Sequence, residues 1–133
     1  MSPITHLNPE ALPANPAFSY AVRVDGGADT LYIGGQNGVR PDGTIAEGIG
    51  AQAEQALENL QTVLESAGAS LEHIVKWTVL AVQGQPLDEG IAAFRKAWGN
   101  RPNPPAISVA VVAGLANPQF LVEIEAIAAV PSG

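Results

Sequence analysis

The chain has 133 residues, which predicts one domain, and 47% of them are hydrophobic, enough for a single core. Thirteen acidic residues against six basic ones give a net charge of −7, which disfavours nucleic acid as a partner because phosphate binding requires clustered cations. The sequence has no cysteine, which excludes a disulfide framework and a thiolate nucleophile. With no signal-peptide pattern and no apolar run near the roughly 18–20 residues that span a bilayer, we expect a cytoplasmic protein without a membrane partner.

The N-terminal quarter of the chain predicts a hairpin after an irregular lead-in. Residues 1–17 contain four prolines and are expected to lack regular structure. The β-branched and aromatic residues of Phe18–Val24 and Thr30–Gln36 predict two strands, and the Asp-Gly-Gly sequence between them predicts the turn. The pair Gly34-Gly35 lies at the end of the second strand, where a backbone can approach a ligand or another chain closely.

The middle of the chain predicts two helices and a strand. Apolar residues recur with helical spacing from about Ile49 to Ala67, and Gly68 is well placed to end that helix. The nine residues Ile74–Val82 are nearly all apolar, which predicts a strand covered on both faces. Leu87–Trp98 predicts a second helix, with an apolar stripe formed by Ile91, Phe94, Ala97 and Trp98.

The C-terminal stretch from Pro102 to Val130 predicts the last two strands. The second of them alternates with period two, so that Glu123 and Glu125 share a face with Leu121 and Ile127. Charged residues are rarely buried unless paired, so this face meets water, contacts a partner chain or lines a site. The element order ββαβαββ predicts an α+β fold with two helices packed on a mixed sheet.

Two segments of this C-terminal stretch resemble the signature of the RidA (YjgF) family. They are Pro105-Ala106-Ile107-Ser108 and Val122–Ala128, and the resemblance runs from about Phe18 to Ala128. It implies a chorismate-mutase-like fold and a homotrimer with three small-molecule clefts between subunits. Active members of the family hydrolyse reactive enamines and imines to ketones and ammonia. We expect no cofactor, and no spacing of His or carboxylate residues resembles a metal site.

The resemblance also implies site positions, several of which depart from the family pattern. Glu123 matches a residue that orients the water or the amine of the substrate, although pairing with a cation or solvent is an equally acceptable interpretation. For Glu125 we favour such pairing. Backbone groups near Gly35 and Ala106 are candidates for polarising the reacting atom. The departures are Ile107 for an arginine that holds the substrate carboxylate, Phe18 for tyrosine, Gly34 for serine and Ile91 for asparagine.

These departures agree in making the cleft less polar, which argues against a 2-imino acid as substrate. We therefore expect a RidA-like hydrolase with an altered substrate. A non-catalytic member that binds a small molecule or a protein is the alternative, and an endoribonuclease is the weakest because of the net charge. Arg101 is a candidate replacement for the missing arginine, whereas Trp77 and Trp98 are expected to be packing residues.

Overall fold

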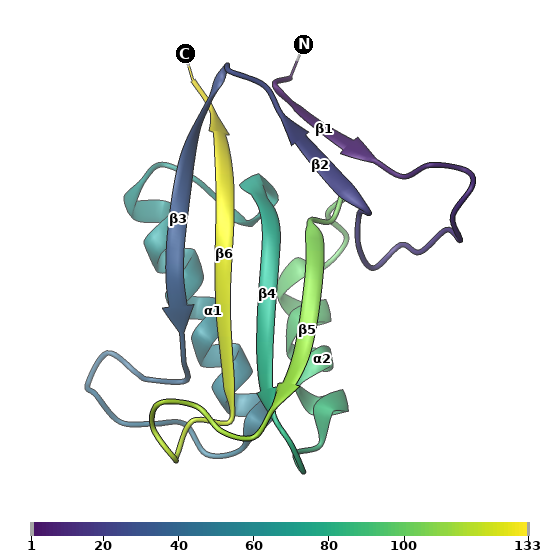
Figure 1. The fold of residues 1–133 in the computed structure, drawn as a ribbon. Helices are drawn as coiled ribbons and strands as arrows, with labels where there is room; N and C mark the ends of the chain where they lie inside the picture. Colours follow the sequence, from purple (N-terminus) through teal and green to yellow (C-terminus); the bar gives the residue numbers. More distant parts are fainter. Residues whose placement is uncertain (1, 133) are drawn as a thin grey trace.

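The computed structural model describes residues 2–132 as six strands and two helices, with one short 3₁₀ helix at Leu71–His73 (Figure 1). In chain order the elements are β1 (Ile4–Leu7), β2 (Ala21–Val24), β3 (Ala28–Gln36), α1 (Ile49–Ser66), β4 (Ile74–Val82), α2 (Leu87–Trp98), β5 (Ala106–Val112) and β6 (Val122–Pro131). In this part of the chain neither helix is long and apolar enough to cross a membrane.

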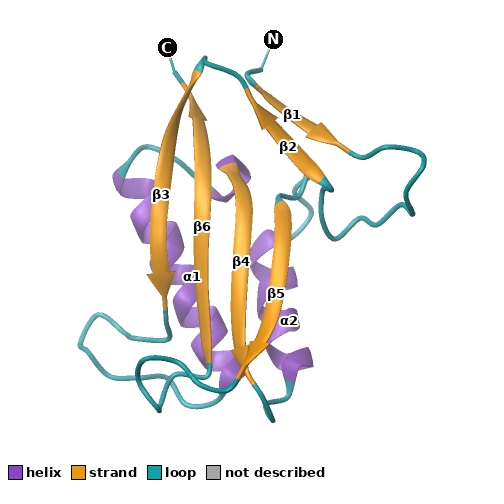
Figure 2. Ribbon diagram, in the orientation of Figure 1, coloured by secondary structure: helices purple, strands orange, loops and turns teal. Residues whose placement is uncertain are grey.

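Four of the strands form a mixed sheet in the order β3-β6-β4-β5. Strand β5 runs parallel to β4, whereas β6 is antiparallel to both β3 and β4. Both helices lie behind one face of this sheet (Figure 2). The predicted α+β fold, with two helices on a mixed sheet, is confirmed, as are the predicted bounds of β4 and α2.

The core lies between the helices and the sheet. Helix α1 contributes Leu57, Leu60 and Leu64, which are almost fully buried, and it ends where Gly68 adopts a positive φ of 72°. Left-handed backbone at this position is typical of glycine and ends a helix. In β6 the predicted alternation is confirmed, because the residues Val122, Ile124, Ala126 and Ala128 all belong to the core.

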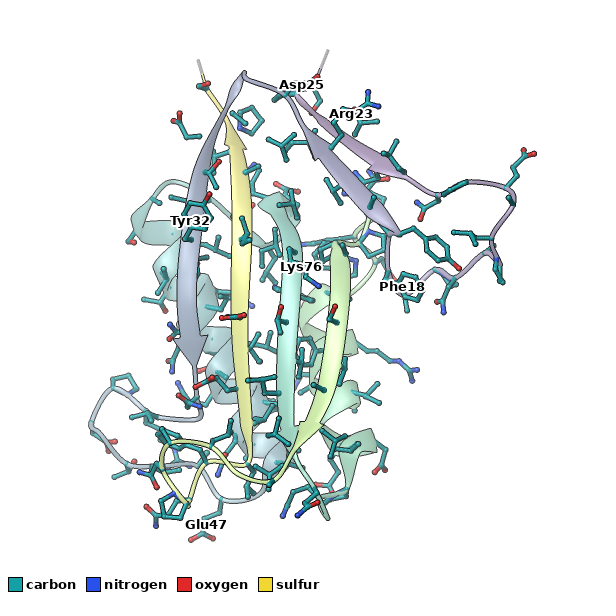
Figure 3. All side chains as sticks on the ribbon, viewed as in Figure 1. Phe18, Arg23, Asp25, Tyr32, Glu47 and Lys76 are labelled. Carbon is teal, nitrogen blue, oxygen red and sulfur yellow. The ribbon has the colours of Figure 1, made fainter. Side chains whose placement is uncertain are left out.

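The opposite face of the sheet, which we call the open face, carries neither of the two helices. Tyr32 and Lys76 project from it in Figure 3, and the Tyr32 side chain is 81% exposed. On this face Thr78, Leu80 and Val82 of β4 are only half-buried. Residues 2–132 of one chain therefore do not cover both faces of β4 as predicted, because both helices pack on the same side of the sheet.

The predicted hairpin between Phe18–Val24 and Thr30–Gln36 is wrong. Strand β2 pairs with β1, whereas β3 pairs with β6, so the β1–β2 pair stands apart from the four-stranded sheet (Figure 1). Leu31 and Ile33 of β3 pack against the core, and their burial favours a place beside β6. The order therefore has three strands before α1 instead of two.

The predicted irregular lead-in contains β1, and the predicted strand starts later than expected. Pro3 and Pro9 flank β1 without interrupting it, so its four residues keep their backbone donors. Phe18 precedes β2, and the next residue, Ser19, is fixed to the start of β5. The Ser19 backbone N–H donates to the Pro105 carbonyl at 3.1 Å, and its hydroxyl donates to the Pro104 carbonyl at 2.5 Å. This anchor holds Phe18 beside the sheet edge.

Candidate functional site

A cavity of about 720 Å³ lies between α2, the helix-side face of β4 and β5, and the segment before β2. Its volume falls within the range of about 300–1,000 Å³ that is common for small-molecule pockets. The floor is formed by buried residues, which include Ile49, Trp77, Val79, Ala81, Gly90, Pro105 and Val122. Exposed residues, among them Ala17, Ile91, Arg95 and Val109, form the rim, so the cavity opens to solvent.

Three of the predicted site residues meet in this cavity. Phe18 enters from the N-terminal segment, Ile91 from α2 and Ile107 from β5, although they are far apart in the sequence. Phe18 also packs edge-on against Tyr20, with ring centroids 5.2 Å apart. Ile91 was expected in the buried stripe of α2, but it is 50% exposed and forms part of the rim. These three side chains give their part of the cavity an apolar surface.

Aromatic residues that the sequence did not identify as site residues form the inner wall of the cavity. Trp77 packs edge-on against Phe94 and Trp98, with centroid distances of 5.2 Å and 5.7 Å. Both tryptophans pack as expected, and both also line the cavity. The indole N–H of Trp77 is buried and has no hydrogen-bond partner among the described residues. The wall therefore offers aromatic surface with very few polar groups.

Arg95, and not Arg101, is the cation at the cavity. The Arg101 guanidinium donates to the carbonyls of Ala97 and Trp98 at 3.0 Å and 2.8 Å, at the C-terminal end of α2. There it satisfies helix carbonyls that lack intrahelical partners. Arg101 does not line the cavity, whereas Arg95 does. Arg101 as a replacement for the missing family arginine is therefore not supported by its position.

Glu123 lies on the open face, in close contact with Gly35. A Cβ atom on Gly35 would fall 2.6 Å from Cδ of Glu123, so only glycine leaves room for the carboxylate in this position. The Nδ2 atom of Asn37 donates to Oε1 of Glu123 at 3.4 Å and to the Val122 carbonyl at 3.2 Å. Asn59 of α1 in turn donates to the Asn37 carbonyl at 3.2 Å. Glu123 is half-buried and positioned by its neighbours.

Asn37, for which the sequence predicted only a place in a loop, belongs to the group of residues around Glu123. The available signal was its place two residues after the Gly34-Gly35 pair. An amide there reaches the same carboxylate that the glycine accommodates.

The remaining predicted positions also lie on or near the open face. Gly34 lines a shallow depression together with Lys76, Glu125 and other residues of β3, β4 and β6. Glu125 is exposed, as the favoured interpretation requires. Ala106 begins β5 opposite Lys76 in the register, and Lys76 donates to the Ser108 hydroxyl at 2.6 Å. None of these residues lines the cavity.

The predicted site residues therefore form two groups on opposite faces of the sheet. Ile107 pairs with Trp77, whose side chain is in the core, whereas Glu123 pairs with Leu80, whose side chain is on the open face. Alternating strand residues point to opposite faces, so Glu123 and Ile107 cannot meet within one chain. Among residues 2–132 the only charged side chain that lines the cavity is that of Arg95. The cavity can bind an apolar group, and the carboxylate of Glu123 can accept or donate a proton.

Solved structures share this architecture. The Rid-family protein YyfB of Yersinia pestis superposes with a TM-score of 0.84 at 32% identity, covering 96% of this chain and 99% of that one. RidA from an Antarctic Psychrobacter superposes with a TM-score of 0.70 at 33% identity, covering 95% and 99%. The fold is thus that of the Rid proteins.

Sequence comparison gives the same family. The sequence model of the family described as endoribonuclease L-PSP matches residues 9–130. Protein HMF1 of Saccharomyces cerevisiae is 33% identical over 131 residues, covering 95% of this chain and 97% of that protein. A rat protein named 2-iminobutanoate/2-iminopropanoate deaminase is 41% identical over 66 residues, covering 48% of this chain and 46% of its own length. The chain belongs to the RidA (YjgF) family.

Proposed function

We propose that the chain forms a homotrimer with a small-molecule cleft between subunits, where it hydrolyses an enamine or imine that is not a typical 2-imino acid. The observation that carries this proposal is the contact between Gly35 and Glu123. It keeps an acid in a fixed position on the open face, next to the Asn37 amide. A rat relative of partial coverage carries the name of an imine deaminase, which supports the reaction class.

The place of the site between subunits is supported by the two separate groups of residues. Glu123 and Gly35 lie on the open face of a chain, whereas Phe18, Ile91 and Ile107 lie behind its sheet. A neighbouring subunit that covers the open face would bring its own copies of Phe18, Ile91 and Ile107 toward Glu123 of the first subunit. In this arrangement the neighbouring subunit would also bury the side of β4 that faces away from the helices.

The altered substrate follows from the chemistry of the cavity. Ile107 has no hydrogen-bond donor, and its neighbours Phe18 and Ile91 have none in their side chains either. A substrate carboxylate placed there would lose its water without gaining a partner, which costs more than the roughly 1.5–3 kcal/mol of a charge-assisted hydrogen bond. The reacting carbon of the substrate should therefore carry apolar substituents.

In the proposed reaction the Glu123 carboxylate orients a water molecule and accepts its proton as the oxygen attacks the C=N carbon. Backbone groups near Gly35 and Ala106 are proposed to polarise the reacting atom. The new C–O bond gives a carbinolamine, and the proton moves to nitrogen. The carbinolamine hydroxyl then gives its proton to Glu123, which passes it to nitrogen as the C–N bond breaks. Ammonia leaves, the C=O bond of the ketone forms, and one water is consumed for each imine.

The test compares two kinds of imine generated in solution. A flavin amine oxidase supplies an imine without a carboxylate from a simple amine, and an amino-acid oxidase supplies a 2-imino acid. We expect faster ammonia release than the uncatalysed rate for the first imine and weak or no acceleration for the second. Glu123→Gln should lower the rate at least tenfold, since a positioned acid or base contributes about 10²–10⁴-fold.

Glu125→Gln, two residues along the same strand face, is the matched control and should retain the rate. Equal rates for Glu123→Gln and the unchanged protein would contradict the role of Glu123. If no carboxylate-free imine is hydrolysed faster than in buffer, a binding protein without catalysis becomes the better description, and the apolar cavity favours a small-molecule ligand.

A further inference from the structure

Within residues 2–132 the cavity is lined by a single charged side chain, that of Arg95, which lies at its mouth. Arg95 follows Ile91 by four residues on α2, so both side chains lie on the same side of the helix, at the rim. Below them the buried surfaces of Trp77, Val79 and Val122 form an apolar floor. A ligand with an apolar body and a polar end fits this distribution of residues.

Arg95 is available to such a ligand. Within residues 2–132 its guanidinium makes no hydrogen bond and no ion pair, whereas the next residue, Lys96, pairs with Glu54 of α1 at 3.8 Å. Arg101, three residues beyond the end of α2, donates to the helix carbonyls of Ala97 and Trp98. Arg95 therefore has its donors free for an anion that approaches from the cavity.

One cation in this position matches one negative charge. The chain carries a net charge of −7, so a ligand with several negative charges would be repelled by the rest of the molecule. A carboxylate satisfies the guanidinium with two parallel hydrogen bonds, which is the geometry that arginine prefers. The aromatic wall of Trp77, Phe94 and Trp98 suits an aryl or alkyl chain attached to that carboxylate.

We propose that the cavity of a single chain binds a monocarboxylate with an apolar aryl or alkyl body, the body resting on Trp77 and Trp98 and the carboxylate paired with Arg95. In this arrangement the acid group is paired with Arg95 at the rim and is not held by the residue at position 107. The binding does not involve Glu123, so it goes beyond the proposed hydrolysis, although both proposals use this cavity. The binding test changes Arg95 and the hydrolysis test changes Glu123, so failure of one is distinguishable from failure of the other.

The experiment uses the full chain and its own fluorescence, because both tryptophans of the protein line the cavity. Phenylbutyrate is the probe, and phenylbutyramide is the uncharged counterpart of the same shape. We expect a saturable change of tryptophan fluorescence with the acid, at one site per chain, and weaker binding of the amide. Arg95→Gln should lower the affinity for the acid about tenfold and leave the affinity for the amide unchanged.

Lys96→Gln is the matched control, because it removes the neighbouring positive charge, which pairs with Glu54. It should change the affinity for neither the acid nor the amide. Ile91→Glu places a carboxylate one helical turn from Arg95 at a half-exposed position and should abolish binding of the acid while the amide still binds. The proposal is overturned if the acid causes no saturable change of tryptophan fluorescence, or if the acid and the amide bind with equal affinity. It is also overturned if Arg95→Gln and Lys96→Gln lower the affinity for the acid to the same extent.

Discussion

Gly34 and Gly35 are neighbours in β3 with opposite surroundings. A Cβ atom on Gly34 would meet nothing within 4 Å, whereas one on Gly35 would overlap the Glu123 side chain, at 2.6 Å from Cδ and 2.9 Å from Oε1. Neither glycine has a positive φ, so backbone conformation does not require glycine at either position. The requirement at Gly35 is space for the carboxylate.

Gly35→Ala should therefore displace the Glu123 carboxylate and separate it from Asn37, with only a small change of stability because a half-buried side chain can move. We expect the rate of hydrolysis of a carboxylate-free imine to fall about as far as in Glu123→Gln. The free energy of unfolding should stay within about 1 kcal/mol of that of the unchanged protein. The measurements are ammonia release and urea denaturation. Gly34→Ala, which should change neither quantity, is the control, and an equal loss in both variants would contradict the steric explanation.

Ile107→Arg alone should not restore hydrolysis of a 2-imino acid. The new guanidinium would point into a cavity lined by Phe18, Trp77 and Ile91, where it loses water and finds no fixed partner. A bidentate clamp also needs support that holds it within about 0.5 Å, which this apolar wall does not give.

The matching measurement compares Ile107→Arg with the triple variant that adds Phe18→Tyr and Gly34→Ser, on an imine derived from serine. Turnover is expected only in the triple variant. If the single variant is as active as the triple variant, the cleft differs from the family pattern in a functional way only at position 107. The claim that the cleft has been remodelled for another ligand would then be wrong.

At the scale of elements, one buried glutamine of α1 fixes two loops. The Nε2 atom of Gln52 donates to the carbonyls of Ala46 and Gln119, both at 3.0 Å, and its Oε1 accepts from the Leu121 N–H at 2.8 Å. Gly38 allows this packing, because a Cβ there would lie 2.6 Å from Cα of Gln52. The loops before α1 and before β6 are thus attached to the same helix.

Gln52→Leu should destabilise the protein by about 2–4 kcal/mol, because it leaves three backbone groups without partners, one of them buried and two partly buried. The free energy of unfolding from denaturant titration measures this loss. Gln55→Leu is the control on the same helix: that side chain makes one hydrogen bond, to Asn59 at 3.0 Å, and its loss should cost less than about 1.5 kcal/mol. An equal decrease in the free energy of unfolding of both variants would show that the three hydrogen bonds of Gln52 do not contribute more than the single one of Gln55.

In the whole molecule, no helix among residues 2–132 covers the open face of the sheet. If the proposed homotrimer forms over this face, light scattering should give three times the chain mass of 13.7 kDa. Ile127→Glu, beside Glu125 on this face, should weaken the assembly through repulsion and loss of apolar contact. Val63→Glu, on the exposed side of α1, should not. A mass of 13.7 kDa for the unchanged protein would contradict the trimer and the intersubunit cleft together.

Local patterns in the sequence were sufficient for most elements and for the family. The helical spacing and Gly68 predicted α1, and the period-two alternation of β6 predicted which of its residues enter the core. The signature residues around Ile107 and Glu123 indicated the family that the comparisons confirm. Each of these features depends on neighbours in the chain, and short-range spacing records such neighbours.

Strand pairing and the grouping of site residues were decided only in three dimensions. Strand β3 had two partners available to it, β2 next in sequence or β6 at the other end, and burial of Leu31 and Ile33 against the core favours β6. Burial also sets Ile107 and Glu123 on opposite faces of the sheet, and it places Arg95, Trp77 and Trp98 around one cavity. Local sequence patterns predicted the family and most elements, though not β1. Tertiary packing decided which residues share a site, because burial depends on contacts between distant segments.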